Sequence, residues 1–376
     1  MMKVLFIAAA MIAIVIVAAA LGEFKSRTAK PAPLSGFVAP FVFGRFQLPA
    51  DNPLTQEAFE LGRRLFYDPR LSIDNTVSCS TCHMQHLAFT DGRKTGVGVS
   101  GKRLAFNSMS LANLMWGPRH FFWNGRAATL EQQALIPIQH PDEMGQGLDE
   151  LVVELEQDAD YRQLFAVAYG ELDAAAIARA LATFQRTLVS ANSRYDKYLR
   201  GEIALTDTEE LGRKLFMAHP DAKVSLRGAN CIDCHSQFLT GGFNTQYDGF
   251  TNNGLDDDAT LAAGLEAVTG DPVHRGLFKV PTLRNIALTA PYMHDGRFNT
   301  LEEVLDHYND GIKKSSTLSP LIMEADNLGK LSDERISLNL TEGEKIAIIT
   351  FLQTLTDEEF VTTEKFSNPL VRESLQ

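Results

Sequence analysis

All four cysteines of this 376-residue chain lie in two copies of the pattern Cys-x-x-Cys-His. Two thiols at this spacing can add to the two vinyl groups of one porphyrin, while the histidine that follows reaches the iron. A thioredoxin-like redox pair does not need that histidine, and two zinc half-sites would have to meet across a long stretch of chain. The pattern therefore predicts two covalently bound c-type haems, the first held by Cys79, Cys82 and His83 and the second by Cys231, Cys234 and His235.

The N-terminal residues indicate export. Residues 1–21 contain one early lysine, Lys3, and then an unbroken apolar run from Val4 to Leu21. Such a segment is typical of a cleaved signal peptide or of an uncleaved N-terminal anchor. Either form places the folded part in the periplasm, where haem attachment of this type takes place. Contact with a membrane is expected only if the segment is retained as an anchor.

Composition limits the partners. The chain carries 47 acidic and 35 basic side chains, a net charge of −12, so nucleic acid is not an expected partner. Residues 22–50 include a proline-rich stretch at 30–40 and are expected to form a linker. The remainder is long enough for two domains.

The same order of motifs occurs twice after this linker. Each copy has a Leu-Gly-Arg-x-Leu-Phe segment, a haem motif, a loop ending in Asn, and a Gly-Arg turn followed by Thr-Leu-Glu. These segments are residues 61–66, 110–113 and 123–131 in the first copy, and 211–216, 282–285 and 294–302 in the second. Self-similarity of this kind indicates two homologous domains. We expect an N-terminal haem domain over residues 51–200 and a C-terminal haem domain over residues 201–376.

The elements between the motifs are predicted to be helical. Apolar residues recur at three- and four-residue spacing in residues 148–169 and 174–189. Capping boxes open amphipathic runs at Thr206, Thr300 and Thr341. The expected fold is mainly α, with two cytochrome-c-like domains related by internal duplication, each carrying one covalently bound haem. A loop over residues 241–276 is expected to wrap the second haem, and its acidic run 256–258 to be solvated rather than to bind a metal.

The two copies differ at one position that matters for chemistry. Tyr308 in the second copy corresponds to Pro137 in the first, and it shares a face of a helix predicted over residues 300–309 with Leu301 and Leu305. It is either a core tyrosine or an axial oxygen ligand of the second haem. Proline offers no ligand, so the first haem would keep an open sixth position. An open iron binds small molecules such as hydrogen peroxide, whereas a closed iron passes electrons.

Three further residues are candidates for the reaction. Gln133 and Glu143 flank Pro137, and a carboxylate beside an open haem can move a proton from the near to the far oxygen of peroxide. A solvated surface position for Glu143 is the simpler interpretation of the residues alone. Trp123, in the run 121–123, is either a core aromatic or a relay between the haems.

Several of these strings resemble the bacterial di-haem cytochrome c peroxidases. They are Phe-Thr-Asp-Gly-Arg at 89–93, Phe-Trp-Asn-Gly-Arg-Ala at 122–127, Phe-Lys-Val-Pro-Thr-Leu-Arg-Asn at 278–285 and Ala-Pro-Tyr-Met-His-Asp-Gly-Arg at 290–297. The resemblance implies two cytochrome-c-like domains and an oxidoreductase that consumes hydrogen peroxide. It assigns Glu143 and Gln133 to the peroxidatic pocket and Trp123 to the bridge between the haems. It also implies a calcium ion between the haems, bound by the side chain of Asn107 and the carbonyls of Thr289 and Pro291.

The chain departs from that family pattern twice. The loop histidine that blocks the peroxidatic iron is absent, since no histidine occurs between Leu87 and Arg119 and its place falls at Val99. The methionine on the second haem is replaced by Tyr308, although Met293 is an alternative axial candidate. Both changes resemble the MauG branch, whose members use peroxide to oxidise residues of a partner protein, with high-valent iron shared between the haems.

Three functions follow as hypotheses. The leading one is a MauG-like enzyme that oxidises a partner protein with hydrogen peroxide. The alternative is an ordinary peroxidase that reduces peroxide to water with a small cytochrome c or cupredoxin as electron donor. The third is an electron-transfer cytochrome, which requires both irons to be closed.

Overall fold

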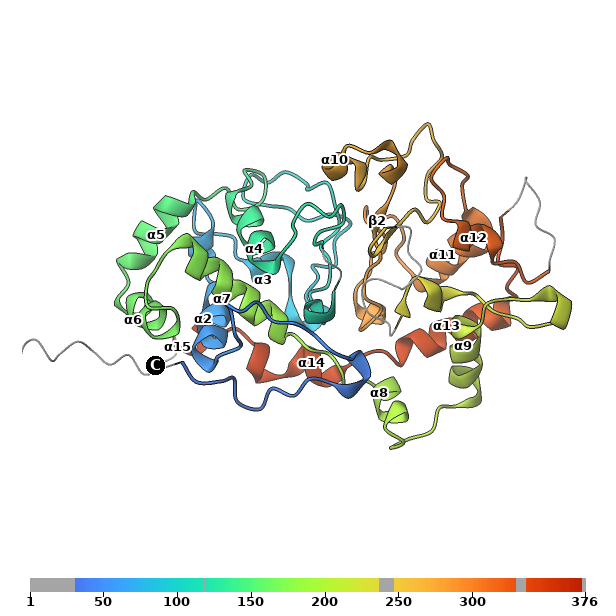
Figure 1. Cartoon of the computed structure of the whole chain (residues 1–376), viewed down its shortest axis with the longest axis horizontal. Coiled ribbons are helices and arrows are strands. Elements are labelled where there is room, and N and C mark those ends of the chain that lie inside the picture. The colour runs from blue at the N-terminus through green and yellow to red at the C-terminus, as the bar shows by residue number, and fades with distance from the viewer. Residues whose placement is uncertain (1–30, 118–119, 237–246, 329–335, 374–376) are drawn as a thin grey trace, which may run out of the picture.

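A computed structural model describes residues 31–117, 120–236, 247–328 and 336–373, and it consists of two helical lobes lying side by side (Figure 1). The expectation of a mainly helical protein is confirmed. The first lobe begins with helices α2 (Gln56–Tyr67), α3 (Cys79–Cys82), α4 (Leu130–Gln139), α5 (Leu148–Glu156), α6 (Ala159–Ala168) and α7 (Ala174–Thr187). Those that follow are α8 (Arg194–Leu199), α9 (Asp207–Met217), α10 (Glu266–Thr269), α11 (Leu301–Asp306), α12 (Pro320–Glu324), α13 (Glu342–Gln353), α14 (Glu358–Thr362) and α15 (Leu370–Glu373).

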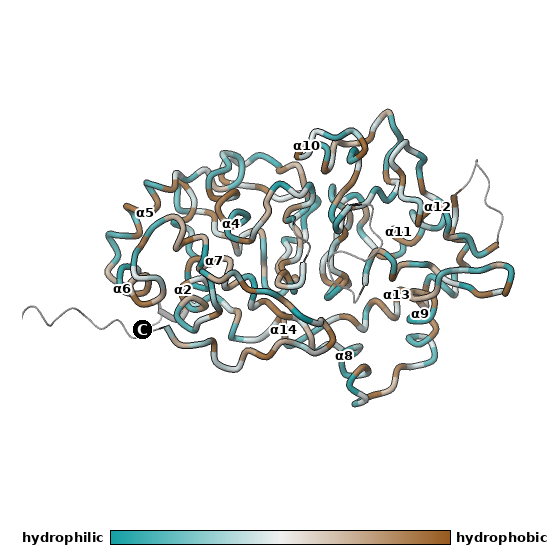
Figure 2. The backbone as a smooth tube through the Cα atoms, in the orientation of Figure 1, coloured by the Kyte–Doolittle hydropathy of each residue, from teal (hydrophilic) through white to brown (hydrophobic). Residues whose placement is uncertain are grey.

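The strands in the described part of the chain are two short ones, β1 (Phe250–Thr251) and β2 (Phe278–Lys279). They pair antiparallel, with Phe250 opposite Lys279. Helices such as α5 and α7 contain both hydrophobic and hydrophilic residues (Figure 2), and α5 buries its leucines Leu151 and Leu155.

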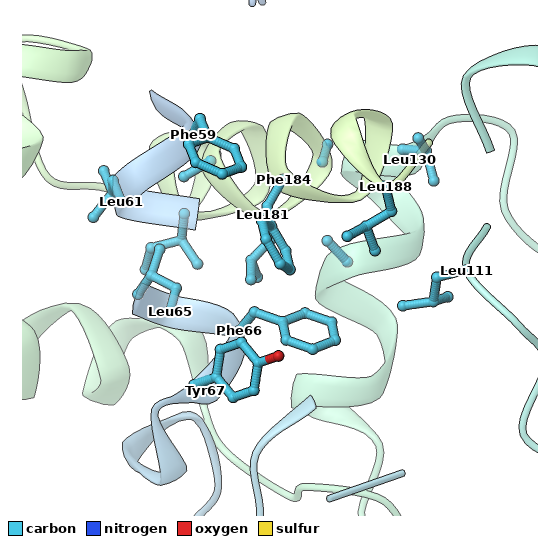
Figure 3. Close-up of a cluster of buried hydrophobic side chains, with 14 of the residues drawn as sticks. Phe59, Leu61, Leu65, Phe66, Tyr67, Leu111, Leu130, Leu181, Phe184 and Leu188 are labelled. Carbon is cyan, nitrogen blue, oxygen red and sulfur yellow. The ribbon is translucent and has the colours of Figure 1, made fainter. Parts of the chain in front are cut away.

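The core of the first lobe forms where α2 crosses α7 (Figure 3). The aromatic rings of Phe66 and Phe184 lie 5.0 Å apart at this crossing. Gly62 makes the close approach possible, because a Cβ at that position would overlap the carbonyl group of Ala180 on α7. A larger residue on α2 would push the two helices apart.

The second lobe contains a similar crossing, between α9 and α13. Gly212 lies against the carbonyl of Ala347, and Phe216 contacts Phe351 with ring centroids 5.7 Å apart. Both helices begin at predicted capping boxes, and the boxes at Thr206, Thr300 and Thr341 are all present.

Two predicted helices end earlier than expected. The run 148–169 is divided between α5 and α6, because the side chain of Asp158 accepts hydrogen bonds from the amides of Asp160 and Tyr161 and starts a new helix there. The helix predicted over 300–309 is α-helical only to Asp306 and continues as a π-helical turn, His307–Gly311. Tyr308 therefore lies in this wider turn.

Both ends of the described chain pack against the fold. After α13 the chain returns to the first lobe, where the hydroxyl of Tyr67 donates to the carbonyl of Phe366 at 2.6 Å (Figure 1). At the other end, Phe43 is buried with its ring 5.1 Å from that of Trp116. The described part of the expected linker, residues 31–50, thus contributes a buried side chain.

No helix in the four described ranges is long and apolar enough to cross a bilayer. The predicted signal or anchor over residues 1–21 lies outside those ranges.

Candidate haem sites and peroxide pocket

The first Cys-x-x-Cys-His motif forms a short helix whose histidine is held by the backbone. Cys79 and Cys82 bound α3, and His83 follows it. The His83 Nδ1 atom hydrogen-bonds the carbonyl of Phe89 at 2.8 Å, and burial lowers the pKa of the imidazole. A neutral histidine that donates from Nδ1 keeps its lone pair on Nε2, the nitrogen that ligates iron.

The second motif has the same arrangement on a 3-10 turn, Cys231–Asp233. The His235 Nδ1 atom hydrogen-bonds the carbonyl of Pro281 at 3.1 Å, and burial lowers the pKa of this imidazole to about 4. The ring is therefore neutral at physiological pH and suited to bind iron.

Each motif borders a largely apolar cavity of its own. His83 and its two cysteines line the first, and His235 and its two cysteines line the second. Burial raises the pKa values of the four thiols, to about 12 for Cys79 and Cys231 and to about 11 for Cys82 and Cys234. Paired thiols, an oriented neutral imidazole and an apolar wall are the donors and surroundings that a c-type haem needs, so the residues present fit that cofactor at both sites.

Gln133, Pro137 and Glu143 all line the first cavity. Gln133 and Pro137 lie on α4, and the turn after α4 folds back so that the Met144 amide donates to the Pro137 carbonyl at 3.2 Å. The Oε1 atom of Gln133 is buried and has no hydrogen-bond partner within the described residues. An unpaired buried oxygen at a cavity wall is suited to bind a small polar ligand.

Glu143 lies beside a positive charge. Its Oε1 atom is 3.4 Å from Nη2 of Arg126, whose guanidinium stacks 3.6 Å from the ring centroid of Phe122. Burial raises the pKa of the Glu143 carboxyl, and the charges of Arg126 and His140 oppose that effect. The simpler interpretation of Glu143 as a solvated surface residue is wrong, since its side chain is only 19% exposed.

Two cavity residues were missed from the sequence, Arg126 and His140. Arg126 belongs to the repeated Gly-Arg turn, which was treated as a motif of the duplication and not as part of the site. His140 ends α4 and accepts a hydrogen bond on Nδ1 from the Asp142 amide at 3.2 Å. His140 lies three residues from both Pro137 and Glu143 in the sequence, and this spacing could have indicated that it belongs to the same cavity.

The loop around Val99 packs by its backbone against the same turn. The Val99 amide donates to the Glu143 carbonyl at 2.7 Å, and a Cβ on Gly98 would overlap the Asp142 carbonyl. Of residues 98–109, Gly98 and residues 104–109 line the first cavity, and Met109 is the one among them whose side chain is a strong iron ligand.

Tyr308 and Met293 both line the second cavity, together with His235. They are linked through Asn253, whose Nδ2 atom donates to the Tyr308 hydroxyl at 3.3 Å and to the Met293 sulfur at 3.4 Å. Burial raises the pKa of Tyr308. A phenolate at this position therefore requires a neighbouring positive charge, such as that of ferric haem.

Trp123 lies between the two cavities and lines both. Its indole Nε1 donates to the carbonyl of Asn107 at 2.9 Å, and its carbonyl accepts from the amide of Lys279 at 2.9 Å. It is 7% exposed, so the ring is fixed between the two sites.

The expected calcium ligands lie on two segments that contact each other. The amide of Asn107 donates to the carbonyl of His294 at 2.9 Å, which joins its segment to the one that contains Thr289 and Pro291. The Asn107 side chain donates from Nδ2 to the Arg93 carbonyl at 2.9 Å, which leaves its oxygen as the ligand atom. The calcium site remains a prediction.

The acidic run 256–258, expected to be solvated rather than to bind a metal, makes contacts within the protein. Asp256 pairs with Arg297 at 2.9 Å, Asp257 accepts from the amides of residues 259 and 260, and Asp258 accepts from Ser316. Across the described ranges, no group of three or more His, Cys, Asp or Glu residues is arranged to hold a metal ion. Of the loop expected to wrap the second haem, Thr251, Asn253 and Leu255 line its cavity, and residues 241–246 lie outside the described residues.

The fold and the two donor sets define a helical c-type haem protein, and comparisons with known proteins identify its family. The profile of the di-haem cytochrome c peroxidases matches residues 56–204. The methylamine utilization protein MauG of Methylorubrum extorquens is 37% identical over 84% of this chain and 82% of its own length. The cytochrome c551 peroxidase of Nitrosomonas europaea is 32% identical over 82% of this chain and 83% of its own.

Among solved structures, a MauG-like protein associated with microbial copper homeostasis superimposes with a TM-score of 0.72 and 39% identity. The match covers 90% of this chain and 98% of that protein. The chain belongs to the di-haem cytochrome c peroxidase family, which includes MauG, and it is a peroxidase-type oxidoreductase. The family implies two c-type haems, in agreement with the two donor sets.

Proposed function

We propose that this protein is a periplasmic, MauG-like enzyme that uses hydrogen peroxide to oxidise a residue of a partner protein. Peroxide takes up two electrons and two protons and leaves as two molecules of water. The partner side chain, for example a tryptophan, supplies the two electrons. When bound, the haems supply the iron at which peroxide is reduced and hold the oxidising equivalents until the partner delivers its electrons.

The difference between the two cavities carries this proposal. Pro137 lines the first cavity and Tyr308 lines the second, and the alignment of the two sequence repeats sets these residues against each other. We expect the first iron to be open to peroxide in the resting protein, because Pro137 offers no ligand and the loop histidine of the ordinary peroxidases is absent. Tyr308, with Met293 as the alternative, closes the second site.

Glu143 and Gln133 act on the peroxide in the first cavity. The Glu143 carboxylate would accept a proton from one oxygen of peroxide and return it to the other, which would leave as water as the O–O bond breaks with two electrons that the haems would supply. Arg126 stabilises the carboxylate form of Glu143 from 3.4 Å. The unpartnered Oε1 of Gln133 can accept a hydrogen bond from peroxide and orient it.

Trp123 connects the two sites, and the calcium ion held by Asn107, Thr289 and Pro291 fixes the segments on either side. Residues 51–200 and 201–376 each hold one haem in this proposal, and a duplication relates them. The matching crossings at Gly62 and Gly212 support that relationship, since the same close approach of two helices occurs in both lobes.

The partner is the least constrained part of the proposal. The 39% identical solved relative is described as associated with microbial copper homeostasis. Copper handling is therefore the first setting in which to seek a protein substrate. The predicted signal segment over residues 1–21 supports export to the periplasm.

Electron paramagnetic resonance of the resting ferric protein tests the central point. We expect one high-spin signal from the open first site and one low-spin signal from the closed second site. Two low-spin signals before any reduction would contradict the proposal, because both irons would then carry two strong axial ligands.

The second candidate function is an ordinary cytochrome c peroxidase with a small cytochrome c or cupredoxin as electron donor. The 32% identity to the Nitrosomonas europaea cytochrome c551 peroxidase favours it. Fast peroxide turnover that depends on such a donor supports this alternative, whereas slow turnover with a covalent change in a partner protein supports the main proposal.

A further inference from the structure

Lys279 is a buried lysine between the two haem cavities. It is 3% exposed and lies on β2, opposite Phe250 of β1. Its amide donates to the carbonyl of Trp123, and it lines both cavities together with that tryptophan. A lysine almost never occupies such a position without a partner.

The protein itself supplies no anion for this lysine within the described residues. No carboxylate there forms an ion pair with its ammonium group, whose Nζ atom lies over the ring of Phe121, 5.5 Å from the centroid. Burial lowers the pKa of Lys279 to about 8, with no charged neighbour to oppose the effect. An aromatic ring offsets only part of the cost of desolvating a cation.

The anion that fits is carried by the cofactor. Each haem has two propionates, and these carboxylates must lie at or near the walls of the cavities that hold the porphyrins. The other cation identified in the first cavity, Arg126, already faces Glu143 at 3.4 Å. Lys279 borders both cavities, so its ammonium is placed to neutralise a propionate where the two sites meet.

We propose that the ammonium of Lys279 pairs with a haem propionate at the junction of the two cavities and thereby raises the reduction potential of that haem. A positive charge close to a haem stabilises the reduced, less positive iron, and neutralising a propionate acts in the same direction. In this role Lys279 does not contact the reacting atoms and acts only through the haem propionate. This effect concerns only the reduction potential of the haem, so it applies to either of the two functions considered above.

The test is a spectroelectrochemical titration of the purified di-haem protein. Lys279→Met removes the charge and keeps an unbranched side chain, Lys279→Gln keeps a polar group without charge, and Lys279→Arg keeps the charge. The matched control is Lys365→Met: Lys365 also lies over aromatic rings, 5.6 Å from the Phe366 centroid, but lines neither haem cavity.

For Lys279→Met and Lys279→Gln we expect the reduction equilibrium of at least one haem to fall about tenfold, which is about 59 mV for a one-electron couple. The Arg variant and the Lys365→Met control are expected to keep the wild-type potentials. Resonance Raman bending modes of the propionates should shift in the neutral variants only.

Two results would overturn the inference. One is a set of potentials in the neutral Lys279 variants that matches the control while both haems are retained. The other is an equal fall in the Arg variant, which would assign the effect to packing instead of charge. If the Lys279→Met protein loses haem, the potentials of Lys279→Gln and Lys279→Arg are compared instead. Equal potentials in these two variants would overturn the inference.

Discussion

Replacing Glu143 by glutamine should remove proton transfer while leaving the pocket intact. The amide has nearly the shape of the carboxyl group but cannot accept the proton of peroxide at neutral pH. The structural cost should be small, because the Arg126 side chain is 28% exposed and solvent can take over part of its charge. Folding and haem content are therefore expected to stay near wild type.

The expected kinetic loss is large. A side chain that transfers a proton in the transition state typically contributes about 10²–10⁴-fold to the rate. Each factor of ten corresponds to about 1.4 kcal/mol, so the barrier should rise by about 3 to 5 kcal/mol. Glu143 lines the cavity together with Gln133 and Pro137. Among the described residues lining this cavity there is no second carboxylate that could replace it.

The assay is stopped-flow mixing of the ferric protein with peroxide, followed at the Soret band. Asp142→Asn is the matched control, because Asp142 is the adjacent residue, pairs with Lys102 at 3.0 Å and does not line the cavity. The control should react like wild type. A Glu143→Gln protein that keeps both haems and reacts within about threefold of the control would refute the role given to Glu143, since general-base catalysis contributes far more than that.

The pH dependence gives a second measure of the same role. The reactive form of Glu143 is the carboxylate, which is present above its pKa and is lost as the pH falls through it. Because burial raises this pKa, the wild-type rate should decline at a higher pH than an ordinary glutamate would give. The decline should be absent in Glu143→Gln.

The remaining predictions concern the second site and stability. Tyr308→Phe should retain both haems but change the low-spin ferric signal, and an unchanged spectrum would favour Met293 as the ligand. Removing calcium with a chelator should lower the thermal midpoint and restoring calcium should return it; no change on either step would count against the site. Gly212→Ala should cost about 1–3 kcal/mol in guanidinium unfolding, because the new methyl overlaps the Ala347 carbonyl. Asp196→Ala should cost about 3–5 kcal/mol, since it leaves the buried Arg284 charge without its 2.6 Å partner; a cost near zero would refute the importance of the pair.

The haem attachment sites could be read from the sequence because the chemistry is local. Two thiols and a histidine within five residues carry the whole signal, and the histidines at 83 and 235 are indeed oriented by backbone carbonyls beside a cavity. The starts of the helices could also be predicted from the sequence, since a capping box depends on four consecutive residues. The boxes at Thr206, Thr300 and Thr341 are present for that reason.

The ends of the helices were harder to predict from the sequence. Asp158 starts a new helix because its carboxylate accepts hydrogen bonds from two nearby amides, an arrangement that competes with continuing the previous helix. The π-helical turn at His307–Gly311 involves a partner from a distant part of the chain, because the His307 ring nitrogen Nε2 hydrogen-bonds the carbonyl of Asn253 at 3.0 Å.

The sequence by itself determined the repeated order of motifs, and it predicted the haem-binding cysteines and histidines and the alignment that sets Pro137 against Tyr308. Only the tertiary structure decided that Arg126 faces Glu143, that Lys279 borders both cavities and that the chain after α13 returns to the first lobe. The physical reason is the range of the interactions. Covalent attachment and helix capping depend on neighbours in the chain, whereas charge pairing and burial depend on which distant segments the folded core brings together.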